Sequence, residues 1–336
     1  ERTNHSDEEL AAEENRMNEN FAIAKMIPPG RRRPGIWRNG VMQIFITRSC
    51  DKACFHCTQN SQLSGKANRI TLEQFERALQ SLRGYFGVYG IFGGNPALHP
   101  EFPELCRLLQ QYVPFEQRGL WCNKPFKHAA IMAETFNPAV SNLNVHQDAE
   151  AWQQFADGWP SCIPYLKGLE SDSRHGPPLV AMQDVLPDES ERWRLISNCD
   201  VNQKWSAMIC PVRGELRAFV CELMGAQAML HQDNPNWMGT GKPMPDVGLP
   251  VTDGWWRKPI MEFKSQIKLH CHACGIPLKG YGALANAGPH EQVSKTHADV
   301  FKPKDSSRPI DIVSDLVQLG EQHLPRATDY LENSAL

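Results

Sequence analysis

Three cysteines stand close together near the start of the chain, as Cys50-x3-Cys54-x2-Cys57. Thiolates are the usual ligands of iron–sulfur clusters, and most clusters take four of them. Three thiolates in one loop can hold three irons of a [4Fe–4S] cluster, which leaves the fourth iron open to a chelating molecule. Two other interpretations stay open at this point. One is a zinc site with His56 as the fourth ligand, and the other is chance clustering.

A second group of cysteines lies in the C-terminal half of the chain. Four thiolates from such a group could fully ligate a second [4Fe–4S] cluster. The alternatives are a zinc site assembled from the run His270 to Cys274, with His272 between the two cysteines, and cysteines that are merely buried. The members of the group are Cys199, Cys210, Cys221, Cys271 and Cys274.

The composition limits the class of protein. The 336 residues are 41% hydrophobic and 22% charged, and the net charge is −3, which does not favour a nucleic-acid partner. No apolar run reaches the ~20 residues that a membrane span needs, and no secretory signal is visible. The eleven cysteines are clustered and odd in number, which favours metal binding over disulfides. We therefore expect a cytoplasmic protein without a membrane or nucleic-acid partner.

Alternating strands and helices must position the first cysteines. The run Val41–Thr47 is a predicted buried strand, and Thr71 with Gln74 predicts a capped helix start. Such alternation favours βα units with a parallel sheet, whose carboxyl edge collects ligands. The further predicted strands are 88–92, 117–122, 140–145 and 179–182, and the further predicted helices are 101–111, 127–136 and 149–157.

The pattern changes near residue 200. The runs 205–209 and 216–221 predict a β-hairpin around Pro211-Val212-Arg213-Gly214. Residues 232–259 form a long loop rich in Pro, Gly and Trp, which is either a lid over a substrate cavity or a surface excursion packed on its own tryptophans. The residues after 309 are expected to form one amphipathic helix.

Placed after a first strand, the Cys50–Cys54–Cys57 motif resembles the signature of the radical S-adenosylmethionine (SAM) superfamily. His56 falls where that family usually has an aromatic residue beside the SAM adenine. The segment Gly93-Gly94-Asn95-Pro96 resembles the family's Gly-Gly-Glu-Pro motif, which binds the SAM amino group, with Asn95 in place of the glutamate. By the same resemblance, the strand ends at Asn123 and His146 lie beside SAM and the substrate.

The second group of cysteines resembles the Twitch domain, a shortened relative of the SPASM domain that holds one auxiliary cluster. The spacing to Gly214 fits Cys199 better than Cys210, so the resemblance implies that Cys210 is free. The implied ligands of the auxiliary [4Fe–4S] cluster are Cys199, Cys221, Cys271 and Cys274.

The resemblance implies an α/β fold, namely a partial (β/α)6 radical SAM barrel followed by a Twitch-like β-hairpin and helix domain. The expected division is a leader at 1–40, the barrel at 41–198, the auxiliary-cluster domain at 199–285 and a C-terminal helical tail at 286–336.

The implied activity is that of an oxidoreductase. SAM, bound to the first cluster, is cleaved reductively to a 5′-deoxyadenosyl radical, which takes a hydrogen atom from a small molecule or, alternatively, a peptide. The auxiliary cluster then accepts an electron, which gives a net oxidation, and flavodoxin or ferredoxin is the expected electron donor. The alternatives are a redox-neutral epimerase, with Cys122 or Cys210 as hydrogen-atom donor, and a non-catalytic iron–sulfur or zinc module.

Overall fold

The computed structural model describes residues 40–64, 68–146, 148–164, 175–199, 207–285 and 290–321, together with Ala12, Arg16 and Glu19. The predicted leader at 1–40 lies almost wholly outside these residues. None of the helices in the described ranges combines the length and the apolar character that a membrane crossing requires.

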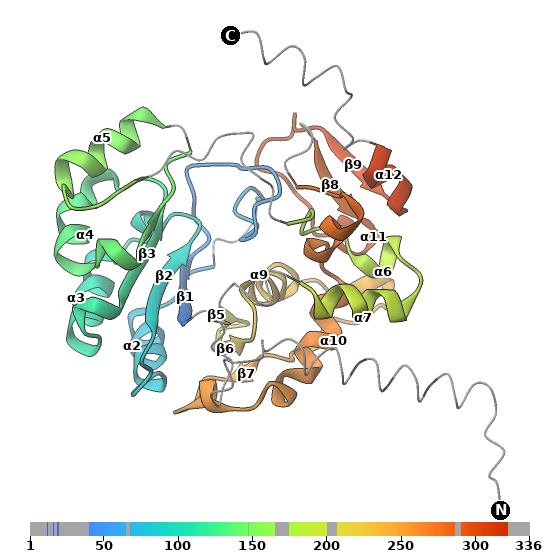
Figure 1. Cartoon of the computed structure of the whole chain (residues 1–336), viewed down its shortest axis with the longest axis horizontal. Coiled ribbons are helices and arrows are strands. Elements are labelled where there is room, and N and C mark those ends of the chain that lie inside the picture. Colours follow the sequence, from blue (N-terminus) through green and yellow to red (C-terminus); the bar gives the residue numbers. More distant parts are fainter. Residues whose placement is uncertain are drawn as a thin grey trace, which may run out of the picture.

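A mixed seven-stranded sheet forms the centre of the molecule, in the order β4-β3-β2-β1-β5-β6-β7 (Figure 1). Strand β1 is parallel to β2 and β5, and β3 continues the parallel arrangement to β4. Strands β5, β6 and β7 are antiparallel to one another. The strands are β1 (Val41–Thr47), β2 (Val88–Gly93), β3 (Arg118–Cys122), β4 (Asn142–Leu143), β5 (Ala207–Val212), β6 (Glu215–Phe219) and β7 (Leu249–Pro250).

The predicted alternation of strands and helices is confirmed for the first four strands. Each is followed by a helix, and these helices lie on the same side of the sheet in Figure 1. The predicted cap is also present, because Thr71 Oγ1 accepts from the Gln74 amide at 3.1 Å and Gln74 Oε1 accepts from the Thr71 amide at 3.1 Å. The helices are α2 (Leu72–Ser81), α3 (Phe102–Tyr112), α4 (Ala129–Thr135) and α5 (Ala149–Gly158).

The predicted hairpin is present, but it does not form a separate sheet. Its turn consists of Arg213 and Gly214 with φ of 52° and 83°, the left-handed pair typical of a tight hairpin. Strand β5 is buried along its whole length, as befits an interior strand, and it pairs with β1. The expected boundary at 198/199 therefore does not divide two sheets.

The predicted strand at 179–182 is wrong. Val180 donates to the Pro177 carbonyl at 3.2 Å in a turn, and α6 (Met182–Val185) follows directly. Short apolar runs indicate burial but do not distinguish a strand from a buried turn. The described residues therefore show four βα units rather than the six of the predicted barrel.

The predicted C-terminal helical tail is also wrong where the structure describes it. A parallel pair of strands, β8 (Glu291–Ser294) and β9 (Ile310–Val313), encloses α11 (Lys295–Ala298), and the short α12 (Leu316–Glu321) follows. The sequence Ile310-Asp311-Ile312-Val313 is rich in β-branched residues, which favour strands. In Figure 1 this unit lies beside the loop that follows β1.

The long loop at 232–259 packs its tryptophans into the protein. Trp255 Nε1 donates to Ser81 Oγ at 3.3 Å, and the Trp256 ring makes an edge contact with Tyr85 at 5.3 Å between centroids. Ser81 ends α2 and Tyr85 lies in the turn between α2 and β2, at the opposite end of the strands from the cysteines. These two tryptophans therefore stabilise the core and do not form the lid that was one of the two expectations.

Candidate functional site

Cys50, Cys54 and Cys57 lie in the cysteine loop, defined here as residues 48–64 between β1 and α2. All three thiols are partly exposed. Burial is the main cause that raises the pKa of Cys50 to about 12; the nearby Cys57, Asp51 and Cys54 add to the rise, and a 3.4 Å hydrogen bond from the Lys52 amide opposes it. Backbone N–H groups directed at sulfur are typical of iron–sulfur sites, where they tune the cluster. The loop thus offers three neighbouring thiols with a polar surround.

Asp51, which follows the first cysteine, links the cysteine loop to two other strand ends. Its Oδ1 accepts from Asn95 Nδ2 at 3.1 Å and from Asn123 Nδ2 at 2.9 Å. Asn95 and Asn123 therefore lie beside the cysteine loop, and their contact with SAM remains a prediction. The group that joins them, a carboxylate, was not among the residues that the sequence singled out.

The side chain of Asn95 is fully engaged within the protein. Its Oδ1 accepts from the Ala97 amide at 3.1 Å, and its Nδ2 also donates to the Lys124 carbonyl at 3.0 Å. Asn95 is therefore the N-cap of a short 3-10 helix (Pro96–Leu98), and this local role explains an asparagine at that position. The negative charge near this point comes instead from Asp51.

The two glycines before Asn95 allow the backbone after β2 to pack directly on the backbone after β1. A Cβ on Gly93 would lie 2.1 Å from the Thr47 carbonyl oxygen, and one on Gly94 would lie 2.5 Å from that of Ser49. The Gly94 amide donates to Thr47 at 2.8 Å and the Asn95 amide to Ser49 at 2.7 Å. The close approach that the glycines permit is thus to the base of the cysteine loop.

His146 reaches the cysteine loop from the end of β4. Its Nδ1 lies 4.0 Å from Cys54 Sγ, and its φ is 48°. Two residues on, Asp148 pairs with Lys52 at 2.7 Å, and this bond, with a contribution from Lys124, lowers the pKa of Asp148 to about 2. Two contacts therefore fasten the end of β4 to the loop.

The ring of His56 lies beside Glu291. Its amide donates to Glu291 Oε1 at 2.9 Å, and its Nδ1 lies 3.6 Å from the same oxygen, with the side chain 2% exposed. The structure thus places His56 against β8, and the half-exposed aromatic of this loop is Phe55. The role of His56 beside an adenine remains a prediction, whereas the zinc site with His56 as fourth ligand is not formed.

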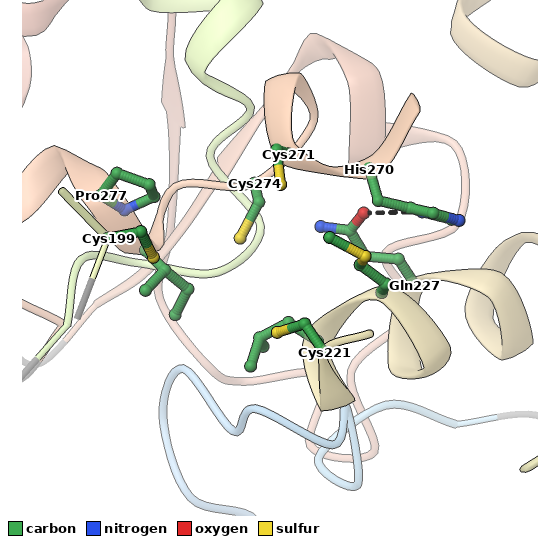
Figure 2. A pocket seen from close by; sticks show the side chains of 10 residues that line it. Cys199, Cys221, Gln227, His270, Cys271, Cys274 and Pro277 are labelled. Carbon is green, nitrogen blue, oxygen red and sulfur yellow. Dashed lines mark hydrogen bonds between the residues drawn. The ribbon is translucent and has the colours of Figure 1, made fainter. Parts of the chain in front are cut away.

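Four thiols of the second group line one cavity, shown in Figure 2. They are Cys199, Cys221, Cys271 and Cys274, the set implied by the resemblance. Cys221 is the N-cap of α9 (Glu222–His231), and Cys271 lies in the last turn of α10 (Lys264–His272). We call this group the four-cysteine cavity.

The thiols of the four-cysteine cavity influence one another. Burial raises the pKa of Cys274 well above its ordinary value, and the other three cysteines raise it further, while the Ile276 amide lowers it by a hydrogen bond. Cys221 stands at the N-terminus of α9, where the helix dipole favours negative charge. The closeness of the four thiols and the helix N-terminus at Cys221 both suit a metal centre that binds the sulfurs as thiolates and offsets the repulsion between them.

The spacing of the thiols fits a cluster better than a single ion. Among the described residues, no three Cys, His, Asp or Glu side chains converge closely enough to hold one metal ion. A cubane cluster presents a different iron to each thiolate, so its ligands stand around a central volume and need not converge on one ion. The run His270 to Cys274, the zinc alternative, likewise brings no three of its ligand side chains to one ion position, while His270 Nδ1 lies 3.2 Å from Gln227 Oε1 and His272 Nδ1 accepts from Arg192 at 3.1 Å.

The two remaining candidate cysteines, Cys210 and Cys122, lie outside the cysteine loop and do not line the four-cysteine cavity. Cys210 is fully buried on β5 beneath Gly225 of α9, and burial raises its pKa well above the ordinary value. Cys122 is 5% exposed, and its thiol donates to Asn95 Oδ1 at 3.3 Å and to the Lys124 carbonyl at 3.3 Å. Burial raises the pKa of Cys122 to about 12, so it is a protonated thiol just beneath Asn95.

Sequence reasoning missed Asp51 and the C-terminal pair Glu291 and Arg308. Asp51 could have been found, because an acidic residue inside a cysteine motif is a charge placed where a ligand binds. Glu291 and Arg308 gave no such signal, since only the fold brings them to the cysteine loop.

No protein-family model matches the chain, and neither does any curated protein. Among solved structures, the crystal structure of BtrN in complex with AdoMet and 2-DOIA aligns with a TM-score of 0.40 at 14% identity, over 74% of this chain and 92% of that chain. The structure of selenomethionine BtrN in an open conformation aligns with a TM-score of 0.36 at 13% identity, over 76% of this chain and 94% of that chain. Because these TM-scores are low, the function is inferred below from the residues of the site.

Proposed function

We propose that this protein is a radical SAM oxidoreductase with two [4Fe–4S] clusters. The observation that carries the proposal is the convergence of three thiols, a carboxylate and two amides at the carboxyl ends of β1, β2 and β3. Ligands of parallel α/β sheets bind at this edge. The four-cysteine cavity is a second, separate thiol site.

Cys50, Cys54 and Cys57 would hold the first cluster, with its fourth iron open. When bound, the cluster supplies a single electron to SAM. The chain's own part is to orient SAM and exclude water.

In the family that this chain resembles, a glutamate at the position of Asn95 binds the SAM amino group. Here Asp51 would supply that carboxylate. Its carboxylate is held by Asn95 and Asn123, at the point where the resemblance places the SAM amino group. A fixed carboxylate attracts an ammonium group more strongly than an amide oxygen does. The charge lost at Asn95 is therefore available from a neighbouring side chain.

Cys199, Cys221, Cys271 and Cys274 would hold the auxiliary cluster with no open iron. Full ligation confines that cluster to electron transfer or structural support. In the proposed reaction, one carbon–hydrogen bond of the substrate breaks and its hydrogen atom goes to the 5′-carbon of the deoxyadenosyl group. The substrate radical would then pass one further electron to the auxiliary cluster and one proton to solvent. With that electron returned to the first cluster, SAM, converted to methionine and 5′-deoxyadenosine, is the oxidant overall.

The burial of the spare cysteines favours oxidation over the redox-neutral alternative. A hydrogen-atom donor must reach the substrate radical, yet Cys210 is fully buried and Cys122 is engaged with two carbonyl oxygens. We propose a small-molecule substrate, with flavodoxin or ferredoxin as the electron donor.

The test is anaerobic reconstitution with iron and sulfide, followed by reduction in the presence of SAM. We expect about eight irons per chain, four for each cluster, and formation of 5′-deoxyadenosine. The variant with Cys50, Cys54 and Cys57 all changed to Ala should keep about half of the iron and lose SAM cleavage. A zinc-loaded protein without iron-dependent absorbance, or iron without SAM cleavage, would count against the proposal.

A further inference from the structure

The C-terminal unit formed by β8, β9 and the residues between them contacts the cysteine loop along much of its length. The Ser64 amide donates to the Lys302 carbonyl at 2.6 Å, and the Lys304 amide donates to Gln62 at 2.9 Å. A β-bridge joins Leu63 to Pro303 between these two bonds. The end of the loop is therefore paired with a segment more than two hundred residues later in the chain.

A buried ion pair stands at the centre of this contact. Arg308 Nη1 donates to Glu291 Oε2 at 2.5 Å, with side-chain exposures of 6% and 0%. The other carboxylate oxygen of Glu291 accepts from the His56 amide at 2.9 Å and from Gln62 Nε2 at 3.1 Å. One carboxylate thus holds the backbone and a side chain of the cysteine loop.

Arg308 extends the contact to the cysteines themselves. Its Nη2 donates to the Ala53 carbonyl, its Nη1 lies 3.5 Å from the Cys54 carbonyl, and its guanidinium lies 4.0 Å from the Phe55 ring centre. Lys304 Nζ adds a 3.3 Å bond to the Cys50 carbonyl. The carbonyls of Cys50, Ala53 and Cys54 are therefore all bound by cations of residues 304–308.

We propose that Arg308, supported by Glu291, is a positioning residue that fixes the geometry of Cys50, Cys54 and Cys57. A short loop with three cysteines cannot direct all three thiols to one volume unless its carbonyls are held. The planar fork of arginine can satisfy a carboxylate and two carbonyls at once and stack on Phe55, which an ammonium group cannot. The consequence for a bound cluster depends on the proposed function, whereas the effect on the loop does not.

The primary test measures hydrogen–deuterium exchange of the iron-free full-length protein. In Arg308→Gln, amide exchange across residues 48–64 should rise by about tenfold or more, as expected for loss of a charge-assisted contact. Exchange in α3 should not change. Because Arg308→Gln leaves a buried carboxylate unpaired and could destabilise the whole protein, the double variant Arg308→Met/Glu291→Gln is compared with it. The double variant keeps an acceptor for the His56 amide and should still show faster exchange at residues 50–55.

The matched control is Arg217→Gln, which removes an arginine paired with Asp246 at 2.8 Å far from the cysteine loop. It should leave exchange at 48–64 unchanged, and Arg308→Lys should restore protection only in part. Unchanged exchange at 48–64 in both Arg308 variants would overturn the proposal, and so would a rise that is equally large in α3.

A second readout separates this proposal from the function on which its consequence depends. After reconstitution, Arg308→Gln should lose the iron of the cysteine loop and keep that of the four-cysteine cavity, seen as loss of one electron paramagnetic resonance signal. If the wild-type loop binds no iron, the proposed function fails, while the exchange measurement still decides the role of Arg308.

Discussion

A carboxylate oxygen that accepts from two amides is held more firmly than a carboxylate on an open loop. Asp51 is in this position, bonded to Asn95 and Asn123 from the ends of two neighbouring strands. The two amides fix its direction without cancelling its charge. Asp51 is therefore a preorganised site for a cation at the carboxyl edge of the sheet.

We expect Asp51→Ala to weaken SAM binding by about 1.5–3 kcal/mol, the range for hydrogen bonds to charged groups. Asp51→Asn keeps the acceptor for both amides and should lose only the part due to charge. Equilibrium binding of SAM to the reconstituted protein, followed by its effect on the cluster spectrum, measures both. Asp157→Asn is the control, because Asp157 accepts from Gln153 on the exposed side of α5. Equal SAM affinity in Asp51→Ala and the wild type would exclude this role.

The cysteines of the second half differ sharply in their surroundings. Cys274 faces three other thiols around a cavity, whereas Cys210 lies beneath α9 outside it. We expect Cys274→Ala to lose the iron of the four-cysteine cavity and Cys210→Ala to keep all of it. Iron analysis together with electron paramagnetic resonance of each variant checks this. Loss of iron in Cys210→Ala, with retention in Cys199→Ala, would mean that the ligand assignment must be exchanged.

At the scale of elements, the turn after β2 supports the cysteine loop through its glycines. A Cβ on Gly94 would lie 2.5 Å and 2.7 Å from the carbonyl oxygens of Ser49 and Arg48. These are backbone atoms, which cannot relieve the clash by a change of rotamer as a side chain can. We expect Gly94→Ala to destabilise the protein by about 1–3 kcal/mol, as overpacking does, and to lower iron retention in the cysteine loop. Urea unfolding and iron analysis measure these two effects.

Gly280→Ala is the matched control, since its added Cβ would meet only the end of the Leu195 side chain, at 3.2 Å. It should unfold close to the wild-type midpoint. If Gly94→Ala behaved in the same way, the strand ends would not be packed as described.

The elements that local chemistry determines were predictable from the sequence. The Thr71–Gln74 capping box and the Arg213–Gly214 turn are both present, because each depends on residues close in sequence. The pairing of β5 with β1 and the strands β8 and β9 were not foreseen. They depend on contacts between distant segments, and a buried four-residue run such as 179–182 has no period that separates strand from turn.

The candidate site was predictable to the same extent. The cysteine spacings identified both thiol groups, and the structure brings together Cys199, Cys221, Cys271 and Cys274. The contacts that orient the site come from the tertiary fold, as Glu291 and Arg308 show. A sequence motif names the residues that bind, whereas the residues that hold the motif in place can lie anywhere in the chain.

At the scale of the whole molecule, the two thiol sites share one sheet. Strand β1 carries the cysteine loop at its end and pairs with β5, while α9, which begins at Cys221, packs on β5 and β6. Ile44 on β1 and Ile209 on β5 are register partners and are both fully buried. The sheet that carries the cysteine loop therefore includes a strand, β5, from the half of the chain that carries the four-cysteine cavity.

This continuity predicts that the first 198 residues do not fold alone. Without β5, strand β1 would become an exposed edge, with open backbone donors and acceptors and with the Ile44 side chain no longer covered. We expect a chain ending at residue 198 to lack cooperative unfolding in near-ultraviolet circular dichroism and to be cut rapidly by protease within β1 and β2. The full chain should show one transition, because the sheet that joins the two sites unfolds as a unit. A cooperative transition in the shortened chain, with iron retained on Cys50, Cys54 and Cys57, would show instead that the first site is an independent domain.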